Sequence, residues 1–132
     1  MKYQLLLILF CCFSQIYAQQ DGGYEILAEG TYRFPEKKAE PINGLESFYT
    51  EFSEKFNFST LSHPNIIEAK CTLEFFVEKD GSLTEINAKM ASYGADKEAI
   101  RLIKSMQKWS PAIQNSEIVR SKYELHLTIK KN

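Results

Sequence analysis

The chain has 132 residues, of which 44% are hydrophobic and 25% are charged. These proportions are typical of a globular protein and weigh against wholesale disorder and against a polytopic membrane protein. The 16 Lys and Arg against 17 Asp and Glu give a formal net charge of -1, so the charge balance does not favour a nucleic acid as the main partner.

The N-terminus has the three parts of a secretory signal peptide. Lys2 supplies the positive charge, residues 5–13 form an apolar run, and Ala18 is the small residue before the cleavage position. The apolar run is shorter than the roughly 20 residues that a membrane-spanning helix needs. We therefore predict that residues 1–18 are removed on export. A short uncleaved membrane anchor is the alternative.

Residues 19–43 show no regular apolar spacing and include the glycines and prolines Gly22, Gly23, Gly30, Pro35 and Pro41. This composition predicts a flexible linker that contains at most a short extended piece at residues 24–34. The folded domain is then expected to occupy residues 44–132.

An amphipathic helix is predicted at the start of that domain. Its apolar residues recur at spacings of three and four and form one stripe, made of Leu45, Phe48, Tyr49, Phe52 and Phe56. Asn43 or Gly44 can open this helix, and residues 58–65 follow as a loop.

A strand is predicted over residues 67–79, because apolar and polar residues alternate there. Its apolar face contains Ile67, Ala69, Cys71, Leu73, Phe75 and Val77. Because Cys71 falls in this series, we expect an inert buried thiol, and the chain's 3 cysteines are too few for a disulfide scaffold. Phe76 interrupts the polar face, so it is expected to be covered or to mark a contact surface.

Asp80-Gly81 predicts a type I′ turn, in which both central residues take positive φ. The strand that returns from this turn is predicted over residues 83–90. A second amphipathic helix follows with Asp96 as its expected N-cap. The buried stripe of that helix is predicted to contain Ala99, Leu102, Ile103 and Met106.

The last strand is predicted over residues 119–129, after a helix stop at Pro111 and a turn at Asn115-Ser116. The element order is therefore helix-strand-strand-helix-strand. This order predicts an α+β fold with two helices packed on one face of a small three-stranded antiparallel sheet. A sheet of that size has two edge strands with unpaired backbone groups.

The sequence has no pattern that favours catalysis or the binding of a cofactor or metal. The 6 glycines never fall in the spacing of a phosphate-binding loop. No histidine pair at helical spacing and no Cys-x-x-Cys follows the predicted signal peptide. His63 lies in a predicted loop and His126 on the polar face of the last strand, where both are expected to be solvated. We predict no enzyme, no cofactor, no metal site and no small-molecule substrate.

Three segments together resemble the C-terminal domain of TonB-type energy transducers, in the form common in Bacteroidetes. Residues 39–49 resemble that family's entry into its first helix, residues 76–83 its first hairpin, and residues 96–111 its second helix with the Trp-Ser-Pro that follows. The three segments occur in the family's order. The resemblance extends from Glu40 to Lys130.

The chain departs from that family in loops, at an edge and upstream of the domain. Phe58-Ser59 stands where the family often has Tyr-Pro, Ser116 where it usually has glycine, and His126 where it often has proline. Transducers of the family also have an uncleaved membrane helix and a long proline-rich spacer, and the sequence predicts neither here.

The resemblance implies a periplasmic module that contacts a TonB-dependent outer-membrane receptor and so serves transmembrane transport. Domains of this family bind an extended receptor segment by adding it as a strand to the sheet edge. An edge strand can accept another chain because its amides and carbonyls on that side are unpaired. The partner-binding edge is expected at Val119, Arg120, Ser121, Lys122, Tyr123, Glu124 and Leu125.

Three other readings of the same features stay open. The basic residues Arg120, Lys122 and Lys130 could serve only to guard the edge against aggregation. The edge could instead pair two copies of the chain into a homodimer with a structural or regulatory role. An uncleaved N-terminal segment would make the protein a self-anchored energy transducer.

Overall fold

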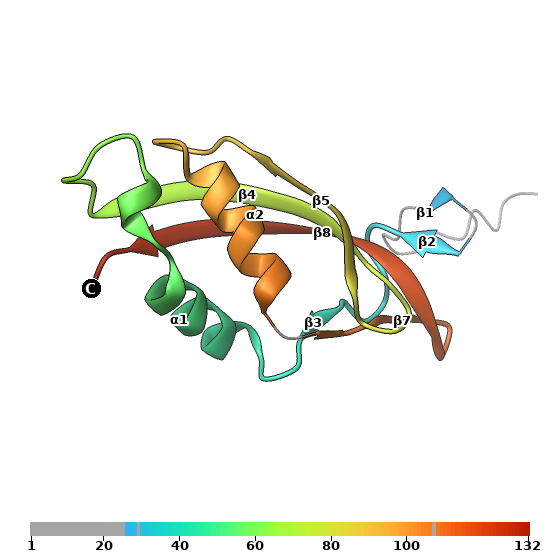
Figure 1. Cartoon of the computed structure of the whole chain (residues 1–132). Helices are drawn as coiled ribbons and strands as arrows, with labels where there is room; N and C mark the ends of the chain where they lie inside the picture. The colour runs from blue at the N-terminus through green and yellow to red at the C-terminus, as the bar shows by residue number, and fades with distance from the viewer. Residues whose placement is uncertain (1–25, 29, 107) are drawn as a thin grey trace, which may run out of the picture.

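The computed structural model describes residues 26–28, 30–106 and 108–132. The predicted signal peptide, residues 1–18, lies outside the described residues. Figure 1 shows the arrangement of the elements, which are β1 (Ile26–Ala28), β2 (Thr31–Tyr32), β3 (Glu40–Pro41), α1 (Leu45–Lys55), the short 3-10 helix η1 (Phe58–Thr60), β4 (Glu68–Val77), β5 (Leu83–Lys89), α2 (Ala95–Ser105), β6 (Trp109–Ser110), β7 (Ala112–Gln114) and β8 (Glu117–Lys130).

Three long strands form the main part of the sheet, and they are the three that the sequence predicts. β8 pairs antiparallel with β4, from Lys130 opposite Glu68 to Ser121 opposite Val77. β4 in turn pairs antiparallel with β5. The two helices lie on one face of this sheet, as expected (Figure 1).

The sheet is larger than the predicted one, so the prediction of three antiparallel strands is wrong, although the α+β class is confirmed. The strand order is β1-β2-β8-β4-β5, with β7 also paired to β8. The sheet is mixed because β2 runs parallel to β8, and a separate two-stranded pair joins β3 to β6. The additional strands have only 2 or 3 residues each, too few for an apolar alternation to be recognised.

Part of the stretch that the sequence predicts as a flexible linker is paired with the domain. Thr31–Tyr32 pair with β8, and Glu40–Pro41 pair with β6. Ala39, just before the second of these pairs, is buried in the core. Residues 19–25 of the predicted linker lie outside the described residues.

The helix starts differ in part from the predicted ones. Gly44, one of the two expected residues, is the N-cap of α1. α2 begins at Ala95 after Gly94, whose φ of 77° is left-handed, so the prediction of Asp96 as N-cap is wrong. Asp96 lies in the first turn instead, where a carboxylate interacts favourably with the positive end of the helix dipole.

Trp109 is fully buried and joins the helices to the sheet. Its ring meets three other rings edge-on: Phe48 of α1 with centroids 5.5 Å apart, Phe75 of β4 at 5.2 Å and Tyr123 of β8 at 4.9 Å. Edge-to-face aromatic pairs contribute roughly 0.5–1.5 kcal/mol each beyond their burial. These contacts hold the ring of Tyr123, a residue of β8, against the core.

The hairpin turn at Asp80-Gly81 forms, but it is not the predicted type I′ turn. Of the two residues, only Gly81 has positive φ. The Gly81 amide donates to the carbonyl of Glu78, and the Glu78 amide donates to the carbonyl of Ser82, both at 2.9 Å. The connection is thus a three-residue loop with a left-handed glycine. The predicted turn at Asn115-Ser116 is confirmed, and there both residues have positive φ.

Phe76 on the outer face of the sheet is covered by the protein's own Arg120. The centre of the guanidinium lies 3.7 Å from the centroid of the ring. Arg120 also donates to the carboxylates of Glu78 and Glu85, at 2.8 and 2.9 Å. Of the two predicted explanations for an apolar residue here, the structure supports the covered side chain.

Candidate functional site

The two borders of β8 differ in how far they are paired. β4 covers one border from Ser121 to Lys130. On the opposite border β2 pairs only with Arg120 and Ser121. Beyond Ser121, no strand among the described residues pairs with that opposite border. Residues 122–130 of β8 therefore form an open edge, which we call the open border.

The register shows which backbone groups the open border offers. The Lys131 amide donates to the Ile67 carbonyl directly opposite, at 2.8 Å. In the antiparallel ladder with β4, hydrogen-bonded pairs alternate with non-bonded ones, so odd-numbered residues of β8 bond to β4. Amides and carbonyls of the even-numbered residues point to the open border, and these residues are Lys122, Glu124, His126, Thr128 and Lys130.

The predicted partner-binding edge is partly occupied by other strands of the same chain. Val119 pairs with Ala112 of β7, and Arg120 and Ser121 pair with Thr31 and Tyr32 of β2. The other four predicted residues, Lys122 to Leu125, lie on the open border. The structure extends the unpaired edge beyond the predicted residues, to Lys130.

The other edge of the sheet, at β5, is less suited to accept a strand. The register between β4 and β5 shifts between Glu74 and Phe76. Glu85 in β5 has a φ of 49°, which takes its backbone out of the extended conformation. Such irregularities interrupt pairing at edges, so the open border of β8 is the regular edge of this sheet.

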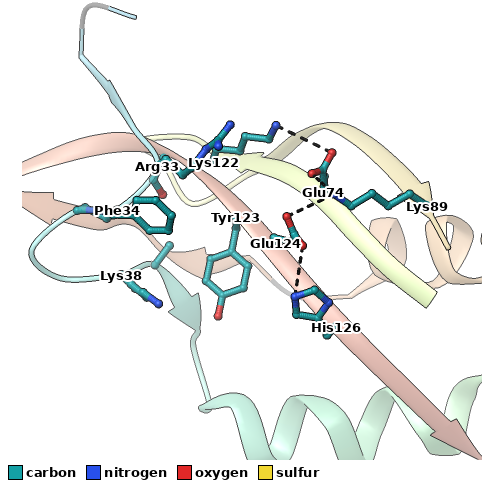
Figure 2. Close-up of a pocket in the computed structure, with 12 residues that line it drawn as sticks. Arg33, Phe34, Lys38, Glu74, Lys89, Lys122, Tyr123, Glu124 and His126 are labelled. Carbon is teal, nitrogen blue, oxygen red and sulfur yellow. Dashed lines mark hydrogen bonds and ion pairs between the residues drawn. The ribbon is translucent and has the colours of Figure 1, made fainter. Parts of the chain in front are cut away.

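A groove of about 560 Å³ lies beside the start of the open border. Its first wall is the segment that leaves β2, residues 33–39, and Figure 2 shows Phe34 turned from this segment toward β8. Its second wall is β8 with side chains of β4 and β5. The lining residues are Arg33, Phe34, Pro35, Lys38, Ala39, Glu74, Lys89, Ser121, Lys122, Tyr123, Glu124 and His126.

The first wall is fixed in place by bonds to β7. Lys37 and Ile113 exchange two backbone hydrogen bonds of 3.0 Å each. The Glu36 amide donates to Oε1 of Gln114 at 2.9 Å, and Gln114 is only 2% exposed. Because Pro35 and Ala39 are also buried, the segment between β2 and β3 is anchored at several points.

Charged side chains of the groove form a network on the outer face of the sheet. Lys89 donates to Glu74 at 2.7 Å and to Glu124 at 3.5 Å, and Lys122 lies 3.9 Å from Glu74. The hydrogen bond from Lys89 holds the pKa of Glu74 below its usual value. Nε2 of His126 is 3.3 Å from Glu124. Figure 2 shows these contacts as dashed lines.

Among the lining residues, cations outnumber acids. Four are Lys or Arg and two are Glu, which gives a formal charge of +2 from 4 − 2, whereas the whole chain has -1. Both glutamates are bonded to lysine or close to it. Lys38 forms no ion pair with any residue in the described part of the chain. The groove therefore favours a negatively charged group.

Aromatic side chains border the same region. Phe34 is 50% exposed. Tyr123 is half-buried, and burial raises the pKa of its hydroxyl. Tyr49 of α1 is 37% exposed, and Figure 1 shows α1 alongside β8. These rings offer apolar surface to side chains of a strand placed on the open border.

The described part of the chain contains one cysteine and two histidines. No group of three His, Cys, Asp or Glu could hold a metal ion there. Cys71 is buried as predicted, and burial raises the pKa of its thiol to about 11. His63 is exposed in a loop, and Nδ1 of His126 lies 3.1 Å from the hydroxyl of Thr72.

No sequence pattern indicated that residues 33–39 contribute to this region. Their Gly- and Pro-rich context indicated only a linker, and no alternation marked Phe34 or Lys38. The burial of Gln114, a polar residue between the apolar Ile113 and the turn, is visible only in the fold. A polar residue at a buried position requires a hydrogen-bond partner, which the segment supplies.

One further property of the described residues concerns membranes. None of their helices combines the length and the apolar character that a membrane span requires.

The chain matches a known protein family. The family described as Gram-negative bacterial TonB protein C-terminal matches residues 55–129. No curated protein matches the chain. The matched range contains β4 to β7, α2 and all but the last residue of β8, so it includes most of the open border. It excludes residues 33–39, the first wall of the groove.

Proposed function

The chain belongs to the TonB C-terminal family, and on that premise we propose that it binds an extended segment of a TonB-dependent outer-membrane receptor as a strand on the open border. The family is one of non-enzymatic protein-interaction domains of the cell envelope. Its role in envelope transport makes receptors of that transport system the proposed partners. The proposed location of the chain is the periplasm.

The observation that supports this proposal most is the open border itself. Five successive even-numbered residues point backbone groups away from β4, and among these groups the parallel register with β2 occupies only the Lys122 amide. About five backbone bonds at a net of about 1 kcal/mol each give about 5 kcal/mol before ordering costs. Side-chain contacts must add to this value for an affinity on the order of micromolar.

The surroundings of the open border can supply such side-chain contacts. On an added strand, alternate side chains point to opposite faces of the sheet. Those on the helix side would approach Tyr123 and Tyr49, which lie close enough to each other to interact electrostatically. Those on the outer side would approach the charged network of Lys122, Glu124 and His126. Both faces therefore contribute to recognition.

A proline substitution on the open border tests strand addition directly. Glu124→Pro removes an amide that points away from β4, so the ladder with β4 is kept. The matched control Glu124→Ala removes only the side chain. The probes are labelled synthetic peptides that cover the periplasmic N-terminal segments of the organism's TonB-dependent receptors, and the readout is fluorescence polarisation.

We expect Glu124→Pro to weaken peptide binding by about tenfold or more, because an amide is lost and the proline ring obstructs pairing. Glu124→Ala should change affinity by less than about threefold. Equal affinities of the wild type and Glu124→Pro, with the fold verified by circular dichroism, would exclude pairing at this border.

A homodimer is a second candidate use of the same border. In an antiparallel pairing of two copies centred on Leu127, Glu124 of each copy would lie opposite Lys130 of the other, which is favourable. The receptor segment and a second copy would compete for the same amides. Light scattering across concentrations separates the two: we expect a monomer, and a dimer that dissociates in Glu124→Lys would favour the homodimer.

The proposed removal of residues 1–18 has its own test. The intact mass of protein recovered from the periplasm is expected to correspond to a chain that begins at Gln19. A chain that keeps the apolar run and sediments with inner membranes would instead indicate the self-anchored energy transducer.

A further inference from the structure

We propose that residues 31–39 are part of the receptor-binding site: β2 stops the added strand at Lys122, and the groove beside it holds an acidic side chain of the receptor segment. This inference rests on the proposed function and deepens it. The segment lies outside the family match, so the specificity it confers would belong to this chain.

The position of β2 limits where an added strand can lie. Thr31 and Tyr32 already pair with Arg120 and Ser121 on that side of β8. A strand on the open border cannot extend past Ser121 without displacing β2. Its pairing therefore ends at Lys122, whose amide faces the Tyr32 carbonyl in this parallel register and whose carbonyl is left for the added strand. Without such a stop, a strand on a long edge can slip in register.

After β2 the chain turns away from β8, and the groove lies between the two. Residues 33–39 pass from β2 to β3, and together with β8 they enclose about 560 Å³. This volume lies within the range of ligand pockets. Because the groove begins at Ser121 and Lys122, it lies where the end of the added strand would leave the sheet.

The wall is preorganised, which lowers the entropy lost on binding. Lys37 is tied to Ile113 by two backbone bonds. The buried Gln114 accepts from the Glu36 amide, and its Nε2 lies 3.3 Å from the Glu36 carboxylate. Phe34 and Lys38, on either side of these anchors, keep their side chains exposed at the groove.

The charge of the groove indicates the chemistry of the bound segment. Arg33 aside, its lining still has three lysines against two glutamates, and Lys89 and Lys122 already neutralise Glu74. Lys38 forms no ion pair with the residues described. The exposed ring of Phe34 adds apolar surface. The partner that fits is an extended peptide. Its end next to residues 33–39 would carry a carboxylate, with an apolar residue beside it.

Charge reversal at two neighbouring lysines tests the groove. Lys38 lines the groove, whereas Lys37 next to it does not, although it is also exposed. Lys38→Glu and the matched control Lys37→Glu are compared in the full chain, with the receptor peptides that bind the wild type. We expect about a five- to tenfold loss of affinity for Lys38→Glu and less than about twofold for Lys37→Glu.

A variant of the peptide completes a double-mutant cycle between Lys38 and the acidic residue of the peptide. When the acidic residue of the peptide is replaced by its amide, the difference between wild type and Lys38→Glu should disappear, because the charge pair no longer exists. Equal losses for Lys37→Glu and Lys38→Glu, or an unchanged difference with the amide peptide, would overturn the role of the groove. Phe34→Ala is expected to weaken the same peptides by about fivefold.

Cross-linking tests the stop at Lys122. In the chain that begins at Gln19, Lys122→Cys is exposed to peptides with a single cysteine at successive positions, while the remaining Cys71 stays buried. One peptide position should dominate disulfide formation. Comparable cross-linking at several positions would show that β2 does not set the register.

These results are separable from those that test the proposed function. If Glu124→Pro abolishes binding while Lys38→Glu and Phe34→Ala leave it unchanged, the strand addition stands and the role of residues 31–39 fails. If Glu124→Pro binds every peptide as the wild type does, the proposed function itself fails.

Discussion

Gly81 lies where the hairpin touches the chain that leaves α2. Its φ is 83°, the Trp109 amide donates to its carbonyl at 3.0 Å, and a Cβ built on it would lie 2.1 Å from the Trp109 carbonyl oxygen. We expect Gly81→Ala to lower the free energy of unfolding by about 2–4 kcal/mol, because a backbone clash adds to the strain of positive φ. Urea denaturation measures this value.

Gly30 provides the matched control for that substitution. Its φ is 71°, but apart from its chain neighbours no heavy atom of the described residues lies within 4 Å of a Cβ built on it. Gly30→Ala should therefore cost only about 1 kcal/mol, the strain of a left-handed alanine. Equal losses in the two variants would show that the approach of Gly81 to Trp109 has no effect on stability.

Glu98 gives a prediction about pH. This residue of α2 is 4% exposed. It accepts from Arg101 at 2.8 Å and from the Asn57 amide at 3.0 Å, and these bonds, that of Arg101 first, hold its pKa below the usual value. A carboxyl with a lowered folded pKa stabilises the fold above its unfolded pKa, and this contribution is lost as the pH falls through the folded pKa.

We therefore expect the stability difference between wild type and Glu98→Gln to shrink as the pH falls from about 7 to about 3. Urea denaturation at several pH values measures this difference. A difference that stays constant over the whole range would mean that the charge of Glu98 does not stabilise the fold.

Single residues also show what the sequence could and could not predict. The burial of Cys71 follows from alternation along β4 and is confirmed. The prediction of Asp96 as the N-cap of α2 was wrong because a left-handed Gly94 ends the preceding loop. The φ of a glycine cannot be read from composition. The close approach of Gly81 to Trp109 depends on a tertiary contact, which local turn rules do not contain.

At the scale of elements, the amides of β8 point alternately to β4 and to the open border. Proline substitutions at neighbouring residues distinguish the two kinds of amide. The Leu125 amide points to β4 and its side chain is 1% exposed. The neighbouring Glu124 amide points to the open border. We expect Leu125→Pro to unfold the domain, because it loses a ladder bond and core packing, whereas Glu124→Pro should cost less than about 2 kcal/mol.

Circular dichroism and thermal melting check both variants. Two folded variants with similar melting temperatures would mean that the assignment of odd-numbered residues to β4 is wrong. The same would follow if Glu124→Pro unfolded the domain and Leu125→Pro did not.

The long elements could be predicted from sequence, and the short ones could not. β4, β5, β8 and both helices contain enough residues for a period to show. β2 has 2 residues and pairs with a strand almost 90 positions away, so only the tertiary fold defines it. This pairing moves the open edge from the predicted residues 119–125 to residues 122–130. Four of the predicted residues, 122–125, lie on the open border, and no local pattern in the sequence indicated the pairing of β2 or the groove wall at residues 33–39.

At the scale of the whole molecule, the folding unit is larger than the family match. Residues 55–129 match the family, yet the core also includes Phe48 and Phe52 of α1 and Ala39 before β3. Trp109 contacts the ring of Phe48 directly. A chain limited to the matched residues would expose this part of the core to water.

Three chains that begin at residues 26, 44 and 56 and end at residue 132 test this view. The chain from residue 44 lacks β1 to β3 and the bonds of Lys37 to Ile113, so its free energy of unfolding should fall by about 2–4 kcal/mol. The chain from residue 56 also lacks Phe48 and Phe52, whose burial contributes roughly 1.5–3 kcal/mol each. Because domains of this size have only about 5–15 kcal/mol in total, it should not fold.

Urea denaturation followed by tryptophan fluorescence orders the three chains, since Trp109 lies in the affected core. Equal stability of the chains from residues 26 and 44 would mean that residues 26–43 rest on the domain without stabilising it. The wall of the groove would then be held too weakly to select a partner. A clear loss in the chain from residue 44 would instead make the N-terminal segment a structural part of the domain, which is what a preorganised binding wall requires.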